Sequence, residues 1–133
     1  MKLLLDTHAL LWWLADDARL GKQARALIAD PGNEVIVSKV SLWEIVVKLR
    51  VGKLAADIGE ITNAVQRDSF TLLDIAVPHL RALSDLPMRH RDPFDHLLIA
   101  QAIIEAATFM SEDRQAALYP VQTMTCSDIN TAA

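Results

Sequence analysis

The sequence is poor in cysteine, glycine, proline and aromatic residues, and each scarcity excludes a class of protein. Of its 133 residues, one is cysteine, four are glycine, five are proline and 5% are aromatic. A single cysteine excludes an intrachain disulfide framework and a zinc site built from several thiolates. The low glycine and proline content, together with 52% hydrophobic residues, excludes collagen-like, low-complexity and disordered chains. We therefore expect a single domain over residues 1–133 with a buried core.

Long apolar runs and an excess of basic charge are also missing. No stretch approaches the about 20 apolar residues that cross a membrane, and the apolar run at residues 3–5 is too short for a signal peptide. Basic residues number 13 and acidic residues 17, which gives a net charge of −4. A generally basic nucleic-acid-binding protein is thus excluded, although a local basic patch is not. We expect a cytoplasmic protein that does not contact a membrane.

Hydrophobic periodicity predicts an alternation of short strands and helices. Residues 2–5 are apolar on both faces, as in a strand buried inside a parallel sheet. Ser38 follows a second apolar strand at 34–37 and can cap the next helix, which Gly52 ends. Helices are expected at 8–15, 19–29, 39–51, 57–68, 78–83, 93–107 and 112–118, and further strands at 70–75, 108–111 and 120–124. This order predicts an α/β fold, a three-layer α/β/α sandwich with a mostly parallel sheet of four or five strands.

Four carboxylates lie close to the carboxyl ends of these strands. Asp6 follows the first strand directly, and Asp113 lies just beyond the fourth. Glu44 lies in the first turns of the helix after the second strand, and Asp95 in the first turn of the 93–107 helix. In an open parallel sheet, ligands bind beyond the carboxyl ends of the strands. Four acids that meet there repel one another and need a cation, and hard oxygen ligands favour Mg²⁺ or Mn²⁺.

Each of these acids also has a purely structural interpretation. Asp6 and Asp95 stand where a carboxylate caps the N-terminus of a helix. Glu44 has Lys48 four residues later, as in an ordinary surface ion pair, and Asp113 is typical of an exposed turn. The residues themselves leave both readings open for each position. A shared site would serve metal-assisted hydrolysis of a phosphodiester.

Asp92 competes with Asp95 for the role of ligand. Asp92 precedes Pro93, and proline is favoured at the first position of a helix, so Asp92 is the better N-cap. Its side-chain oxygens are then occupied by backbone N–H groups. We therefore predict that Asp95 binds the metal and that Asp92 caps the helix or supports the site from outside.

Two basic clusters stand near these acids. One contains Arg89 and Arg91, and the other contains Lys48, Arg50 and Lys53. Either can hold phosphates, which positions a nucleic acid without reading its sequence, or can consist of solvated charges. The sequence contains three tryptophans, Trp12, Trp13 and Trp43. We interpret them as core or dimer-interface residues in preference to platforms on which bases stack.

Four segments resemble the PIN-domain family, and in particular the VapC toxins of bacterial toxin–antitoxin pairs. They are LLLDTHALLWWL at 3–14, SLWEI at 41–45 with the Lys48 and GKL that follow, HRDPFDHLLIAQA at 90–102, and SED at 111–113. Their order and spacing extend the resemblance from residue 3 to about residue 124. The resemblance implies a Mg²⁺-dependent ribonuclease, with Mn²⁺ as a substitute, whose four acids match Asp6, Glu44, Asp95 and Asp113.

The resemblance also implies supporting groups and partners. Thr7 and Ser111 lie where family members often place a supporting hydroxyl. The last acid of this branch more often follows Thr-Arg or Thr-Ser, whereas here it follows Ser111-Glu112. The family implies an RNA substrate, a homodimer and a small antitoxin protein whose tail blocks the groove. Two other functions fit the same residues: a metal-dependent phosphatase or DNA nuclease, and a non-catalytic module that binds RNA or protein.

Overall fold

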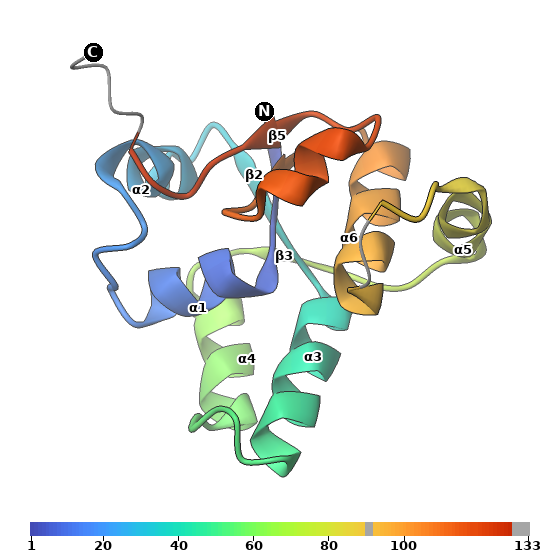
Figure 1. The fold of residues 1–133 in the computed structure, drawn as a ribbon. Helices are drawn as coiled ribbons and strands as arrows, with labels where there is room; N and C mark the ends of the chain where they lie inside the picture. Colours follow the sequence, from blue (N-terminus) through green and yellow to red (C-terminus); the bar gives the residue numbers. More distant parts are fainter. Residues whose placement is uncertain (90–91, 129–133) are drawn as a thin grey trace.

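The computed structural model describes residues 1–89 and 92–128 and contains an alternation of strands and helices (Figure 1). The strands are β1 (Lys2–Leu5), β2 (Glu34–Ser38), β3 (Thr71–Leu73), β4 (Thr108–Met110) and β5 (Thr123–Met124). The helices are α1 (Thr7–Leu14), α2 (Lys22–Ala29), α3 (Lys39–Arg50), α4 (Ile58–Arg67), α5 (Val77–Asp85), α6 (Pro93–Ile104) and the 3₁₀ helix η1 (Arg114–Leu118). No helix in these described ranges is long and apolar enough to cross a membrane.

The described strands form one parallel sheet in the order β3-β2-β1-β4-β5. The chain moves outward from β1 to β3 and then returns to the other side of β1 with β4. The direction of winding therefore reverses between β1 and β4, where ligands bind in open α/β sheets. Leu5 pairs with Met110 across this boundary, so the residues that follow them, Asp6 and Ser111, leave the sheet side by side.

The sheet is buried on both faces, which explains the unbroken apolar runs of its inner strands. Leu3 and Leu5 of β1 belong to a core cluster with α1, α2 and α4, and Leu4 belongs to a second cluster with α6 and η1. Figure 1 shows α1, α2 and α4 on one side of the sheet and α5 and α6 on the other. The predicted three-layer sandwich with a mostly parallel sheet of four or five strands is confirmed, and the sheet formed by the described residues has five strands, all parallel.

The largest differences from the predicted elements lie at two helix ends and in the last strand, which was predicted at 120–124 and covers only Thr123–Met124. The predicted 19–29 helix begins only at Lys22, because Gly21 is its N-cap in extended conformation. The predicted 93–107 helix ends at Ile104, because Ala106 adopts a positive φ of 53°. The last predicted helix is a short 3₁₀ segment, which the apolar pattern of residues 112–118 does not distinguish from an α-helix.

Candidate active site

Asp6 lies directly beyond β1 and is buried. Its Oδ1 accepts a hydrogen bond from the Ala9 backbone N–H over 2.7 Å, which makes Asp6 the N-cap of α1. Burial raises its pKa above the ordinary value, although the Ala9 N–H and the Ser111 hydroxyl favour the charged form. The capping interpretation is thus confirmed, and the same carboxylate also stands at the reversal point of the sheet.

Glu44 comes from the second turn of α3 and is buried as well. Thr7 Oγ1 donates to Glu44 Oε1 over 2.7 Å, and Lys48 Nζ donates to Glu44 Oε2 over 2.7 Å. The expected ion pair with Lys48 is therefore present, but it is not a surface pair, because only 5% of the Glu44 side chain is exposed. Ser41 also belongs here, since its Oγ lies 3.1 Å from Thr7 Oγ1. Sequence reasoning missed Ser41, although it stands one helical turn before Glu44.

Asp92 is the N-cap of α6, as predicted. Its Oδ1 accepts hydrogen bonds from the backbone N–H groups of Phe94 and Asp95 over 3.0 and 3.2 Å. These bonds, with Pro93 in the first turn, place the Asp95 carboxyl in the first turn of α6. The local pattern of Asp92 followed by Pro93 predicted this helix start, and α6 begins there.

Asp95 has a pKa raised to about 8. Burial is the largest cause, and the negative charges of Asp92, Asp6, Glu44 and Asp113 follow in that order. Charges act on a pKa in this way only from the neighbourhood of the carboxyl group. Asp6, Glu44, Asp95 and Asp113 therefore lie around one region of the molecule.

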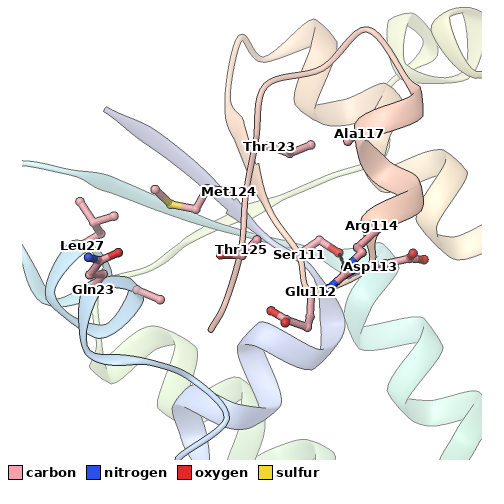
Figure 2. A pocket seen from close by; sticks show the side chains of 11 residues that line it. Gln23, Leu27, Ser111, Glu112, Asp113, Arg114, Ala117, Thr123, Met124 and Thr125 are labelled. Atoms are coloured by element: carbon pink, nitrogen blue, oxygen red, sulfur yellow. Dashed lines mark hydrogen bonds between the residues drawn. The ribbon is translucent and has the colours of Figure 1, made fainter. Parts of the chain in front are cut away.

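Asp113 lies on the turn between β4 and η1 and is exposed. Its Oδ1 accepts from the Gln115 backbone N–H over 2.9 Å, and its own N–H donates to Ser111 Oγ over 3.1 Å. The turn interpretation is confirmed at this position. Figure 2 shows the side chains of Glu112 and Asp113 pointing in different directions from this turn, beside a cavity of 460 Å³.

Glu112, the additional acid, holds the segment that follows β5. Its Oε2 accepts from the backbone N–H groups of Cys126 and Ser127 over 3.1 Å each, and its Oε1 accepts from Ser127 Oγ over 2.9 Å. Cys126 is fully buried, and burial together with the charges of Asp6 and Glu112 raises the pKa of its thiol. The hydrogen-bond partners of Glu112 are therefore Cys126 and Ser127, and Glu112 is not among the acids that raise the pKa of Asp95.

Replacing Glu112 with alanine is expected to lower the free energy of unfolding by about 1 kcal/mol, because three hydrogen bonds to one exposed carboxylate are lost. Affinity for Mn²⁺ should not change. Urea denaturation and Mn²⁺ titration of the same preparation measure both quantities. Asp113→Asn is the matched neighbour, and a larger loss of Mn²⁺ affinity in Glu112→Ala than in Asp113→Asn would contradict this division of roles.

The donor set suits a hard divalent cation in its chemistry. It consists of carboxylate oxygens whose mutual repulsion a cation would relieve. Within residues 1–89 and 92–128, however, no group of three or more Asp, Glu, His or Cys side chains is arranged so that it could hold an ion. The acids thus fit a divalent cation in their chemistry, while the described side chains do not form a ready-made metal site.

The basic residues expected to contact a substrate are placed only in part. Arg89 is exposed, and its backbone N–H donates to Tyr119 Oη over 3.0 Å. Arg91 lies outside the described residues. His8 is exposed beyond Asp6, with its ring centroid 5.8 Å from that of Trp12.

Replacing Asp92 with alanine is expected to cost about 1 kcal/mol of stability, because two backbone N–H groups at the start of α6 lose their acceptor. Asp92→Asn should keep the cap, most of the stability and the metal affinity, since asparagine caps about as well as aspartate. Thermal and urea denaturation of both variants measure the difference. Equal stability of Asp92→Ala and Asp92→Asn would show that the N-cap contributes little to the free energy of unfolding.

Comparison with known proteins gives a family and a fold. The family model described as PIN domain matches residues 3–121. Comparison with curated protein sequences finds no match. Among solved structures, the fold resembles a chain of VapBC2 from Rickettsia felis bound to a DNA fragment from its promoter, with 16% identity and a TM-score of 0.71. The match covers 94% of this chain and 98% of that one.

Two further structures are similar over comparable lengths. A chain of a toxin–antitoxin complex from Klebsiella pneumoniae is 19% identical with a TM-score of 0.65, and the match covers 96% of this chain and 99% of that one. A chain of DNA-bound VapBC from Salmonella typhimurium is 12% identical with a TM-score of 0.66, covering 95% and 98%. At these identities the similarity establishes the fold.

Proposed function

Because the chain belongs to the PIN-domain family, we propose that it is a metal-dependent endoribonuclease and the toxin of a toxin–antitoxin pair. The observation that carries this proposal is the position of Asp95, whose pKa is raised to about 8 first by burial and then by the carboxylates of Asp92, Asp6, Glu44 and Asp113. Fold stability gains nothing from gathering like charges at one edge of a sheet. A site that binds a divalent cation and a phosphodiester explains why these acids lie together.

In this proposal each acid has a role. Asp6 and Asp95 hold Mg²⁺ or Mn²⁺, and Glu44 and Asp113 complete the ligand set or orient the attacking water. When bound, the cation supplies a Lewis acid that lowers the pKa of water and offsets charge in the transition state. Attack by water on phosphorus breaks the bond to the 3′ oxygen and leaves a 5′-phosphate and a 3′-hydroxyl. The RNA 2′-hydroxyl takes no part.

The supporting residues keep these carboxylates in place. Thr7 Oγ1 fixes one oxygen of Glu44, and Lys48 Nζ fixes the other. Ser111 donates a hydrogen bond to Asp6, which favours its charged form. Groups whose orientation is fixed in advance need little reorganisation when charge develops during the reaction.

Incubation of the purified protein with single-stranded RNA, single-stranded DNA and p-nitrophenyl phosphate tests the activity. We expect cleavage of RNA that requires Mg²⁺ or Mn²⁺, stops with EDTA, and leaves ends that are ligated without prior phosphorylation. Cleavage of DNA or of the small ester without cleavage of RNA would favour the other hydrolases. No cleavage of any substrate, with no binding of Mn²⁺ in calorimetry, would favour a non-catalytic binding module.

A homodimer and a small antitoxin are the partners that we propose. The complexes named for Rickettsia felis and Klebsiella pneumoniae support an antitoxin by fold similarity. Trp43 on α3 supports a protein interface, because 57% of it is exposed and its ring contacts Phe94 at a centroid distance of 4.9 Å. Trp12 and Trp13, in contrast, pack against the core, as predicted. Light scattering of the isolated chain measures its mass and so tests the dimer. The location of the protein in the cytoplasm stays a prediction.

A further inference from the structure

A second cavity, of 530 Å³, lies between α1, the segment after it, the end of α3 and the segment that leads to α4. This volume is in the range of pockets that hold small organic groups. Its lining combines an apolar floor with a polar and basic rim. The floor includes Leu11, Trp12, Leu54 and Ile61, and the rim includes His8, Asp17, Arg19, Lys48 and Lys53.

Two flat groups are stacked in this cavity. The guanidinium carbon of Arg19 lies 4.9 Å from the centroid of the Trp12 ring. Asp17 holds the guanidinium in place, because Arg19 Nε donates to Asp17 Oδ1 over 3.1 Å and an Arg19 Nη donates to Oδ2 over 2.7 Å. These bonds lower the pKa of Asp17 to about 2. The Arg19 side chain is 68% exposed, so a planar surface is presented to solvent in a fixed orientation.

The cavity adjoins the acids of the candidate active site. Lys48 lines the cavity and also binds Glu44 Oε2. His8 also lines the cavity and follows Asp6 by only two residues. Lys53 stands at the outer rim beyond Gly52, whose φ of 74° turns the chain after α3. No ion-pair partner of Lys53 is found within the described ranges of the chain.

We propose that this cavity binds one nucleotide of single-stranded RNA next to the bond that is cut, with the base stacked on the Arg19 guanidinium, which itself lies over Trp12, and with a phosphate on Lys53. The inference rests on the proposed ribonuclease function and names its substrate contacts. Stacking on aromatic rings and guanidinium planes is how proteins hold unpaired bases of any sequence. The basic rim compensates for the acidic region beside it, which by itself repels phosphate.

RNA fits this cavity better than an acidic peptide does. Arg19 and Lys48 already have carboxylate partners within the chain, so a further carboxylate gains little from them. A stacked base does not compete with these carboxylates. It contacts the face of the Arg19 guanidinium, and the edge of the guanidinium stays bonded to Asp17. Lys53 then contributes the contact to phosphate.

Binding without cleavage tests the subsite. Asp6→Asn in EDTA is mixed with a 5′-labelled single-stranded RNA, and fluorescence anisotropy gives Kd at several salt concentrations. Adding Arg19→Ala should raise Kd at least about fivefold through lost stacking. Arg19→Lys should weaken binding almost as much, because it keeps the charge but loses the plane. Lys53→Ala should reduce the slope of log Kd against log salt by about 0.7.

Arg81→Ala is the matched control, since Arg81 is exposed on α5, across the sheet from the cavity. It should bind RNA as the parent does, and circular dichroism checks that every variant is folded. Unchanged Kd in both Arg19→Ala and Lys53→Ala would overturn the subsite even if the wild-type protein cuts RNA. Weakened binding in these variants, with no cleavage by the wild type, would support the subsite while the proposed function fails. Loss of antitoxin binding with unchanged RNA binding would assign the cavity to the protein partner and overturn the inference.

Discussion

Asp6→Asn is expected to abolish RNA cleavage while the protein stays folded. The asparagine keeps the size of the side chain and an oxygen that can accept from the Ala9 N–H, so the start of α1 is preserved. It removes the negative charge that would attract the cation, and amide oxygen is a weaker ligand for it. Loss of a partner outside the ligand shell already costs about 10- to 100-fold. Loss of a direct ligand should therefore lower the cleavage rate by more than about a hundredfold.

Asp57→Asn is the matched control for this variant. Asp57 is also an N-cap aspartate, since its Oδ1 accepts from the Glu60 N–H over 3.0 Å, but it is exposed at the start of α4. Both variants should melt close to the wild type, and only Asp6→Asn should lose activity in a gel assay with Mg²⁺. Wild-type cleavage by Asp6→Asn would show that the active site lies elsewhere.

Local signals in the sequence were sufficient for most elements of the fold. Apolar runs located the strands, and capping residues located helix starts such as those after Ser38 and Asp92. These signals work because an N-cap and its helix are neighbours in the chain. Helix ends were less predictable, since the positive φ of Ala106 leaves no mark in residue type.

The gathering of the acids depends on long-range order that no local pattern contains. It requires β4 to return beside β1, which places Ser111 next to Asp6 after about a hundred residues of chain. The same applies to the burial of Glu44, whose spacing to Lys48 is also typical of a surface pair. The family resemblance supplied this order where the residues themselves left alternatives open.

For Trp12, the interpretation as a core or dimer-interface residue was correct but incomplete. Trp12 does pack against the core, as its apolar neighbours predict. Its ring is also stacked with Arg19, seven residues later and beyond the end of α1. That contact depends on the turn after α1, where Asp16 has a positive φ of 52°. A side chain of this size can serve the core with one face and a cavity with the other.

Divalent metal is expected to stabilise the protein, and increasingly so as the pH rises from 6 to 8. The folded-state pKa of Asp95 is about 8, against an ordinary value of 3.8. Between these values the unfolded chain loses this proton and the folded chain keeps it, so the free energy of unfolding of the metal-free protein falls with rising pH. Since one pKa unit corresponds to about 1.4 kcal/mol and Asp95 is partly exposed, we expect a loss of about 2 kcal/mol. Asp6, whose pKa is also raised, adds to the loss in the same direction.

Mn²⁺ at about 100 Kd should add about 2.7 kcal/mol and raise Tm by roughly 5–10 °C, because it binds the folded form and displaces the Asp95 proton. Melting curves at pH 6, 7 and 8, with Mn²⁺ and with EDTA, measure both effects. Asp95→Asn should flatten the metal-free pH dependence and remove most of the gain from Mn²⁺, whereas Asp92→Asn should keep that gain. If Asp92→Asn loses the Mn²⁺ effect and Asp95→Asn keeps it, the ligand is Asp92. A Tm that saturating Mn²⁺ leaves unchanged at every pH would instead mean that the carboxylates around Asp95 do not share a cation, and their crowding would need another cause.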